Sequence, residues 1–396
     1  MPPLIFRKGL DLKREVAGVL AESYHSDLVQ QIKDADFQFH SGRLTIHLAR
    51  EFGFCYGVDR AVDYAYQARK RFPDRPVFLT GEIIHNPHVN EQLRAQGIRF
   101  LSDAGESIDA LTAEHVVILP AFGVTIELLT DLQERGVTMV DTTCGSVLNV
   151  WKNVKRYAED RFTSVIHGKY WHEETRATAS QACTGGGGHY LVVLNEDEAS
   201  AVCDYIRRGG HGQSGDRAAF LSRFERAASP GFDPDRDLDR IGCANQTTML
   251  SSESLKIGAM FRDAIRDRHG EDALPERFRA FDTICSATQE RQDAILSLLG
   301  SHPLDLMIVL GGYNSSNTCN LARICAGRVA TFHVSDPDGL VSAAEIRHKP
   351  VGVAQETTTA GWLPEGRLRV GLTSGASTPD NLVGAVVRRL DSLANG

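Results

Sequence analysis

From about residue 45 onward, short apolar runs alternate with longer stretches whose apolar residues recur at helical spacing. The short runs are rich in β-prone residues, and several of them end in a polar or small loop, as buried strands do. Strands and helices that alternate in this way predict α/β units with mainly parallel sheets. Nine runs carry this prediction: LTIHLA, RPVFLT, EHVVIL, VTMV, FTSVIH, DRIGCAN, FRAF, DLMIVL and RVGLTS.

One cysteine-containing phrase occurs twice with a matching setting. Asp-Thr-Thr-Cys at 141–144 returns as Asp-Thr-Ile-Cys at 282–285, each time between a β-prone run and a helical stretch. Cys55 has the same setting, between LTIHLA and GVDRAVDYAYQARKRF. We therefore expect Cys55, Cys144 and Cys285 where a strand leads into a helix. Unpaired N–H groups and the positive end of the helix dipole favour the thiolate there, and thiolate is the form that ligates metals.

The same order of parts occurs three times and predicts three α/β domains after an N-terminal extension. Residues 1–44 are expected to form a mainly helical packing or partner arm without chemistry of its own. A turn-rich segment at about 179–240 is interpreted as a surface insertion. The predicted domains are 45–137 with Cys55 and His85, 138–278 with Cys144, His172, Glu174 and Thr247, and 279–396 with Cys285, Ser315, Ser316, Asn317, Ser377 and a C-terminal helix.

Polar side chains suited to an anionic ligand follow several of the predicted strands. In parallel sheets ligands collect at the carboxyl ends of the strands, so these loops are expected to face one centre. Each residue alone is explained as well by helix capping. Together, imidazoles, hydroxyls and amides at helix N-termini would form a diphosphate cradle. The candidates are His85, Asn86, His172, Ser315, Ser316, Asn317 and Ser377.

Glu174 is the carboxyl best placed for proton delivery, because it follows His172 by two residues in the loop HGKYWHEET. Thr247, in NQTTML, offers a hydroxyl relay, and His167 is a weaker candidate. A glutamate at a helix start is also explained by its favourable interaction with the helix dipole.

The three repeated cysteines lack the short spacing of many zinc and ferredoxin sites, yet their equivalent settings favour a shared iron–sulfur site. Three protein ligands on a four-iron cluster would leave one iron open to substrate. The other cysteines lack this setting and are expected to be bystanders: Cys183, Cys203, Cys243, Cys319 and Cys325.

Composition narrows the classes of function. The chain has 396 residues, 42% of them hydrophobic, and a formal net charge of −8, which argues against a nucleic-acid backbone as the main partner. No apolar run approaches the ~20 residues of a membrane span, and the N-terminus lacks the apolar core of a signal peptide. Eight scattered cysteines favour a reducing compartment. We expect a cytoplasmic protein without a membrane or nucleic-acid partner.

Several motifs in this order resemble those of the 4-hydroxy-3-methylbut-2-enyl diphosphate reductase family, also called IspH or LytB. The resemblance runs from about residue 48 to 385. It is carried by FGFCYGVDRA, GEIIHN, DTTC, HGKYWHEET, NQTTMLSSE, DTICSATQERQ, NSSNT and TSGASTPDNLV.

The resemblance implies an oxidoreductase of isoprenoid biosynthesis. The family reduces its allylic diphosphate with two electrons and two protons, loses the hydroxyl as water, and forms isopentenyl and dimethylallyl diphosphates in the last step of the methylerythritol phosphate pathway. Its fold is three α/β domains in a pseudo-threefold trefoil around one central 4Fe-4S cluster. A ferredoxin or flavodoxin is the expected electron donor.

The family's functional residues fall on positions already singled out. The resemblance assigns the cluster to Cys55, Cys144 and Cys285. It assigns proton delivery to Glu174 with assistance from Thr247, and counts His172 with the catalytic residues. The implied diphosphate ligands are His85, His172, Ser315, Ser316, Asn317 and Ser377.

One position departs from the family pattern. Shorter bacterial members have a histidine in an Ala-His-Gly-Val phrase, where this chain has Phe122. The Ala-Phe-Gly-Val phrase of this chain at 121–124, its N-terminal extension and its SPGFDP segment resemble the longer cyanobacterial and plant-like branch. No diphosphate role is transferred to Phe122.

Two other classes of function remain open at this point. A non-enzymatic iron–sulfur sensor would not need converging His, Ser and Asn donors. A zinc-dependent, non-redox enzyme acting on a phosphorylated metabolite would be colourless and free of sulfide.

Overall fold

The computed structural model describes residues 4–184, 187–209, 214–281 and 283–396. The chain forms two compact units. The first consists of Met1–Ala121, Gly136–Thr142 and Ser286–Gly396, and the second of Phe122–Arg135 and Thr143–Cys285.

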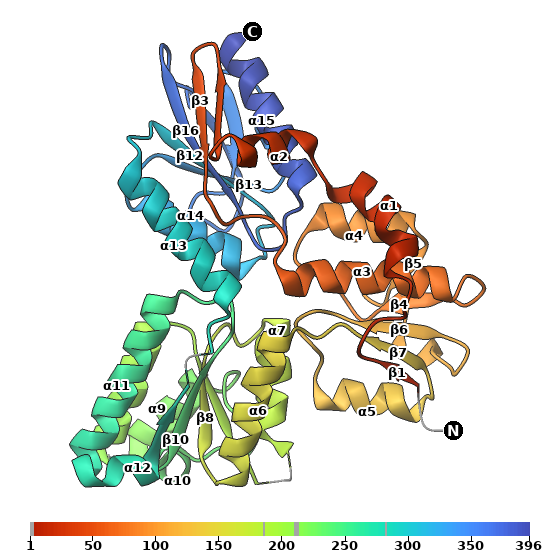
Figure 1. Ribbon diagram of the computed structural model, residues 1–396. Helices are drawn as coiled ribbons and strands as arrows, with labels where there is room; N and C mark the ends of the chain where they lie inside the picture. The colour runs from red at the N-terminus through yellow and green to blue at the C-terminus, as the bar shows by residue number, and fades with distance from the viewer. Residues whose placement is uncertain (1–3, 185–186, 210–213, 282) are drawn as a thin grey trace. The chain divides into compact units, whose positions relative to one another are not determined.

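The first unit contains a five-stranded sheet with the order β1-β7-β6-β4-β5, and all of its strand pairs are parallel (Figure 1). All four residues of β6 are buried, as expected for a parallel strand that is covered on both faces. Its strands are β1 (Ile5–Phe6), β4 (Val77–Leu79), β5 (Ile98–Phe100), β6 (Val116–Leu119) and β7 (Thr138–Asp141). The helices that accompany it are α1 (Lys13–Tyr24), α3 (Tyr56–Arg71), α4 (Pro87–Ala95) and the 3₁₀ turn η1 (Ile108–Ala110).

A second five-stranded sheet lies in the same unit, with the order β13-β12-β16-β3-β2, and only the β2–β3 pair is antiparallel. Its strands are β2 (Gln38–Ser41), β3 (Leu44–Leu48), β12 (Leu306–Leu310), β13 (Thr331–Val334) and β16 (Leu368–Ser374). Its helices are α2 (Asp27–Asp34), α13 (Ser286–Ser301), α14 (Ser316–Ala326), α15 (Asp380–Asn395) and η4 (Pro337–Gly339). A separate antiparallel hairpin joins β14 (Glu345–His348) to β15 (Thr357–Ala360).

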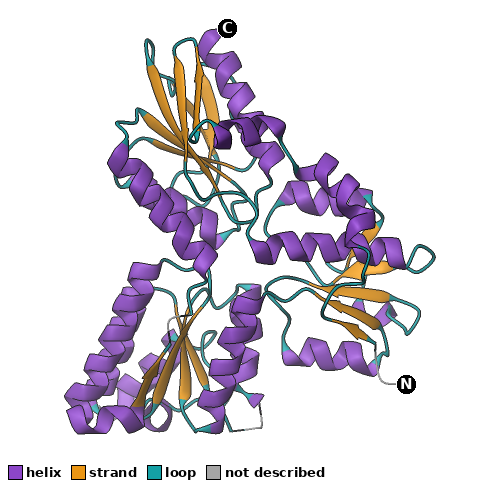
Figure 2. Ribbon diagram, in the orientation of Figure 1, coloured by secondary structure: helices purple, strands orange, loops and turns teal. Residues whose placement is uncertain are grey.

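Strand β12 shows how the chain covers both faces of that sheet. Leu306, Ile308 and Leu310 belong to the apolar core shared with α2 and α15, whereas Met307 and Val309 belong to the core shared with α13 and α14. Successive side chains of a strand point to opposite faces, so an unbroken apolar run indicates helices on both sides. Figure 2 shows helices on both sides of this sheet.

The second unit is built on a four-stranded parallel sheet with the order β11-β10-β8-β9. Its strands are β8 (Thr163–His167), β9 (Tyr190–Val193), β10 (Ile241–Asn245) and β11 (Phe278–Ala280). Its helices are α5 (Ile126–Glu134), α6 (Gly145–Glu159), α7 (Glu173–Ala182), α8 (Glu196–Arg208), α9 (Ser214–Arg223), α10 (Pro234–Asp237), α11 (Ser251–His269), α12 (Leu274–Arg277) and η3 (Glu271–Ala273). All nine strands predicted from the sequence are present, and the α/β prediction is confirmed.

The interpretation of 179–240 as a surface insertion is wrong for most of the segment. Strand β9 pairs with β8, and its Leu191, Val192 and Val193 are buried in the core of the sheet. Helices α8 and α9 add residues such as Val202 and Phe220 to the same core. The glycines and prolines mark turns between these elements. A short apolar run between two turns, such as Tyr190–Val193, still forms a core strand.

The strand before each repeated cysteine pairs with a strand of the neighbouring predicted domain. Strand β3 pairs with β16, β7 with β6, and β11 with β10. Each of these strands is therefore hydrogen-bonded into the sheet of one predicted domain. The helix after its cysteine, α3, α6 or α13, belongs to the next predicted domain. Hydrogen-bond partners decide which sheet a strand joins, and the residues of the strand do not reveal them. The predicted domain boundaries at 45, 138 and 279 each fall at or within one of these strands.

The N-terminal extension contributes strands as well as helices. Strand β1 extends the first sheet beside β7, and β2 extends the other sheet of the first unit beside β3. The extension is thus a packing arm inside the first unit. Over the described residues, none of the helices combines the length and the apolar character required for a membrane span.

Candidate active site

The repeated cysteines lie at helix starts, as predicted. Cys55 is the N-cap of α3 and Cys144 the N-cap of α6, both with extended backbone, and Cys285 directly precedes α13. The side chains of all three are partly exposed. Cys55 lies in the first unit, and Cys144 and Cys285 lie in the second. Their ligation of one cluster stays a prediction, and Asp282 of the second phrase lies outside the described residues.

Three of the remaining cysteines are buried in apolar cores. Burial raises the pKa of the Cys203 thiol and of the Cys325 thiol to about 12, and it also raises the pKa of Cys243. Burial raises the pKa of Cys183 as well. Thiols held in the protonated form are poor metal ligands, which agrees with their expected role as bystanders.

In the first unit, the peptide groups of Ala376 join three of the predicted site loops. The Ala376 carbonyl accepts a hydrogen bond of 3.1 Å from Cys55 N–H, and Ala376 N–H donates to Asn317 Oδ1 at 3.0 Å. The neighbouring Ser377 hydroxyl donates to the His85 carbonyl at 3.3 Å. Four predicted residues from four distant segments therefore lie in one network: Cys55, His85, Asn317 and Ser377.

The start of α14 supplies both a helix cap and an available donor. Ser315 is the N-cap, and its hydroxyl accepts from Thr318 N–H, so the simpler capping explanation holds for this residue. Asn317 is 2% exposed, and its Nδ2 has no hydrogen-bond partner among the described residues. A buried amide donor without a partner is costly unless a ligand accepts from it.

Glycine permits the close approach of the His85 loop to the loop before α14. A Cβ on Gly312 would lie 2.4 Å from the His85 carbonyl oxygen, which excludes any other residue without a backbone shift. His85 follows β4 on the loop before α4, and its Nδ1 lies 2.8 Å from Glu82 Oε2. Glu82 thereby orients the imidazole, a role like that of carboxylates behind ligand histidines.

In the second unit, a chain of hydrogen bonds runs from the start of α7 to Cys285. His172 is the N-cap of α7, and its Nδ1 accepts from Glu174 N–H at 3.1 Å. Glu174 Oε1 accepts from Thr247 N–H at 2.5 Å, and the Thr247 carbonyl accepts from Cys285 N–H at 3.3 Å. His172, Glu174 and Thr247 are all buried. The predicted proton donor is therefore connected through the Thr247 backbone to the backbone of a predicted metal ligand.

Phe122 contacts a predicted ligand instead of supplying one. Its ring lies edge-on to the His172 imidazole, with 6.1 Å between the ring centroids. The weaker candidate His167 bonds to Ser254 Oγ at 2.7 Å and is 1% exposed, an arrangement that suits a structural histidine.

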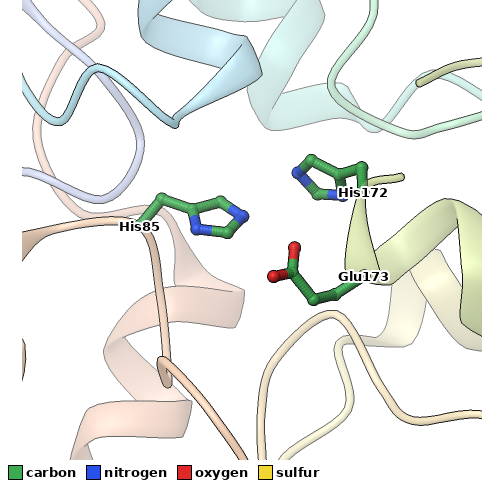
Figure 3. A group of neighbouring side chains, drawn as sticks. All are labelled: His85, His172 and Glu173. Carbon is green, nitrogen blue, oxygen red and sulfur yellow. The ribbon is translucent and has the colours of Figure 1, made fainter. Parts of the chain in front are cut away.

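Sequence reasoning missed several residues that shape these networks. Glu173 is exposed beside His172 at the start of α7 (Figure 3). Gln246 Oε1 accepts from Lys169 N–H and from Thr175 Oγ1, which ties the loop before α7 to the end of β10. Glu82 was missed as well. It alone could have been found from the sequence, because it precedes the candidate ligand His85 by three residues.

Parallel sheets, with thiol-bearing turns and polar side chains at the carboxyl ends of their strands, define this chain as an α/β protein. Comparison with known proteins leads to the family. A model of the family described as "LytB protein" matches residues 46–391. The chain belongs to this family.

Named relatives support this family membership, and a solved structure has a similar fold. The chain is 49% identical over 391 residues to a 4-hydroxy-3-methylbut-2-enyl diphosphate reductase of Synechococcus sp. (strain RCC307), covering 98% of this chain and 93% of that protein. It is 48% identical over 395 residues to the enzyme of that name from Gloeobacter violaceus (strain ATCC 29082 / PCC 7421), covering 98% and 92%. The fold is similar to that of a Plasmodium falciparum E-1-hydroxy-2-methyl-but-2-enyl-4-diphosphate reductase, with a TM-score of 0.61, 22% identity and coverage of 87% and 86%.

Proposed function

We propose that this protein is an iron–sulfur oxidoreductase that converts 4-hydroxy-3-methylbut-2-enyl diphosphate to isopentenyl and dimethylallyl diphosphates, the terminal reaction of the non-mevalonate pathway. The C–O bond of the allylic alcohol breaks, two electrons and two protons enter, and the hydroxyl leaves as water. Family membership with close relatives of this name over nearly the whole chain supports the assignment.

The cluster ligands we propose are Cys55, Cys144 and Cys285, holding one 4Fe-4S cluster with one iron open to the substrate hydroxyl. The donor chemistry fits, because three thiols occupy equivalent, partly exposed positions at helix starts, where a negatively charged group is stabilised. When bound, such a cluster supplies single electrons and Lewis acidity. We propose that the three sheets surround it as a trefoil of three domains.

The Ala376 network is the single observation that best supports the diphosphate site. Hydrogen bonds to Ala376 join the backbone of Cys55 to the amide of Asn317, and the Ser377 hydroxyl follows directly, so a proposed metal ligand and proposed anion donors share one set of loops. We propose that His85, His172, Ser315, Ser316, Asn317 and Ser377 bind the diphosphate. Neutral amides and hydroxyls at helix starts can do so without a lysine and arginine cluster.

Glu174 is the proposed proton donor, with Thr247 and His172 assisting. The backbone N–H of Thr247 donates to Glu174 Oε1 and so orients the carboxyl group, which in its protonated form has an O–H to donate. Burial around Glu174 excludes water that would compete for that proton.

An external electron donor is required, because the reaction consumes two electrons. We propose a ferredoxin or flavodoxin, and a cytoplasmic location, which suits a chain with eight scattered cysteines. The first candidate partner is therefore a small electron-transfer protein.

Anaerobic purification, an absorbance spectrum, iron and sulfide analysis, and product analysis with the allylic diphosphate test the proposal. We expect a brown protein with about four iron atoms per chain, a ratio set by the 4Fe-4S assignment, and both isopentenyl and dimethylallyl diphosphates as products. An iron–sulfur sensor would hold the cluster without turnover. A zinc enzyme would be colourless and contain zinc without sulfide.

A further inference from the structure

Arg291 is a buried cation that contacts backbone carbonyls. It lies on α13, six residues after Cys285, and is 3% exposed. Its Nη2 donates to the Gly53 carbonyl at 2.7 Å, and its Nη1 donates to the Ala287 carbonyl at 2.8 Å. Among the described residues no carboxylate forms an ion pair with its guanidinium. A buried positive charge without a carboxylate partner is costly, so it is expected to have a role beyond packing.

Both backbone polar groups of Gly53 form hydrogen bonds to side chains. Its N–H donates to Ser374 Oγ at 3.0 Å on β16, and its carbonyl accepts from Arg291. Its φ of +78° is a left-handed conformation, and a Cβ there would lie 2.7 Å from Asp380 Oδ1, so only glycine fits. This turn leads in two residues to Cys55, and Arg291 donates a hydrogen bond to it.

Arg60 repeats the arrangement at another turn. It lies on α3, five residues after Cys55, and its Nη2 donates to the Thr142 carbonyl at 3.1 Å. Thr142 is fully buried, and both its N–H and its hydroxyl donate to the Leu119 carbonyl. Thr142 precedes Cys144 by two residues, as Gly53 precedes Cys55.

The third turn is held differently. Thr283 precedes Cys285 by two residues, and its Oγ1 accepts from Asn245 N–H at 2.7 Å. The corresponding positions of α6, Asn149 and Val150, carry no cation. The arginine contact therefore occurs at two of the three repeated turns.

We propose that Arg291 and Arg60 are positioning residues, each of which holds the strand-to-helix turn that carries a cluster ligand, Cys55 for Arg291 and Cys144 for Arg60. In each case the helix that follows one cysteine fixes the turn of another. This inference rests on the proposed cluster. Charge-assisted hydrogen bonds restrict the carbonyls that they reach, and groups behind metal ligands typically set the affinity for the metal.

Arg291 also supplies positive charge near Cys55. Two residues of chain span at most about 7 Å, so the guanidinium lies close to the Cys55 backbone. Positive charge beside a negatively charged cluster raises its reduction potential, because reduction adds another negative charge. Loss of the charge is therefore expected to lower the midpoint potential.

The test compares four variants of the anaerobically purified holoprotein. Arg291→Met and Arg60→Met remove a donor while keeping side-chain length. Arg291→Lys keeps the charge but loses the planar fork that reaches two carbonyls. Arg71→Met, at an exposed position of α3, is the matched control.

Three measurements are made: amide hydrogen exchange in segments 49–58 and 138–147, the rate of iron loss to a chelator, and the cluster midpoint potential. We expect Arg291→Met to speed exchange in 49–58 alone and Arg60→Met to speed it in 138–147 alone. Iron loss should accelerate about tenfold to a hundredfold in both, the effect typical of groups behind metal ligands. Arg291→Met should lower the potential, Arg291→Lys should restore it without restoring exchange protection, and Arg71→Met should match wild type.

Equal exchange increases in both segments, or iron loss at the wild-type rate, would overturn the positioning role. If Arg291→Met fails to fold, Arg291→Lys and Arg60→Met still decide the outcome by segment-specific exchange. Wild-type protein that holds a cluster but does not reduce the allylic diphosphate would contradict the proposed function without contradicting this inference. Wild-type protein without a cluster would overturn both.

Discussion

Glu174 is 3% exposed, and one of its carboxyl oxygens is fixed by the backbone of Thr247. A glutamate at a helix start is common and usually needs no further explanation than the helix dipole. Here the side chain turns away from its own helix to the loop after β10, which leads back through the Thr247 carbonyl to Cys285. The carboxyl group therefore lies against the loop after β10, where we propose that it delivers a proton.

We predict that Glu174→Gln lowers turnover by roughly a hundredfold or more, because the amide still accepts from Thr247 N–H but delivers no proton. Cluster absorbance and substrate binding should be retained. Single-turnover kinetics with a chemical reductant measure the effect. The control is Glu127→Gln, which alters an exposed glutamate in the first turn of α5 and should leave turnover unchanged. Wild-type turnover in Glu174→Gln would remove this residue from the mechanism.

His333 on β13 should make the stability of the first unit depend on pH. Burial, opposed by its hydrogen bond to the Gly311 carbonyl, lowers the pKa of His333 to about 4 from its ordinary 6.5, and the nearby Lys349 and His348 act in the same direction as burial. Below pH 6.5 the unfolded chain takes up a proton that the folded chain does not, so the free energy of unfolding falls until about pH 4.

Over that window the loss should approach about 3 kcal/mol, since each pKa unit corresponds to about 1.4 kcal/mol. Urea unfolding from pH 7 to 4 measures it, and His333→Gln should flatten the slope. His47, whose pKa is also lowered to about 4, chiefly by burial, titrates in both proteins. Its contribution therefore cancels in the comparison, and identical slopes for the two proteins would contradict the prediction.

At the scale of elements, the hairpin β14–β15 supports the loop before α14. Tyr313 OH donates to Glu356 Oε1 at 2.7 Å, and Lys349 Nζ lies 5.6 Å from the Tyr313 ring centroid. The Tyr313 ring packs edge-on against His333, which bonds to Gly311. Ser315 follows Tyr313 by two residues, so the hairpin holds the start of the loop that carries proposed diphosphate ligands.

Glu356→Ala should therefore weaken substrate binding. It removes the acceptor for Tyr313 and a partner of Arg347, and we expect roughly a tenfold rise in KM, equivalent to about 1.4 kcal/mol, with kcat nearly unchanged. Glu345→Ala alters an exposed carboxylate of the same hairpin and serves as the control. Equal KM values in the two variants would show that the Tyr313 contact does not position the loop.

Elements were easier to predict than their partners. The apolar runs at β8 and β12 are buried throughout, and their flanking turns marked their ends. Strands β3, β7 and β11 were found as well, but each pairs with a strand of the neighbouring predicted domain. Pairing depends on hydrogen bonds between segments that are far apart in the chain, so local periodicity carries no record of it.

At the scale of the whole molecule, the N-terminal extension is integrated into the first unit. Leu10 is 5% exposed, and its N–H donates to Gln67 Oε1 on α3. Tyr24 OH bonds to Tyr66 OH, and Lys33 pairs with Asp380 on α15. The extension thus contacts helices that accompany both sheets of this unit.

Leu10→Ala should lower the free energy of unfolding of the first unit by about 2–4 kcal/mol, because it removes a buried side chain and leaves a cavity. The control is Leu4→Ala, because Leu4 is 56% exposed, and it should change the free energy of unfolding by less than about 0.5 kcal/mol. Chemical denaturation measures both. If the two variants are equally stable, the extension folds independently of the unit.

The sequence by itself determined the α/β class, the nine predicted strands, and the helix-start setting of the three repeated cysteines, because these follow from local periodicity and from spacing within single segments. Only the tertiary structure decided which sheet each strand joins and that residues 190–208 are core. It alone also placed Arg291 and Arg60 on the turns before Cys55 and Cys144. Those outcomes depend on contacts between residues that are distant in the chain, and one segment read alone carries no information about its distant partner.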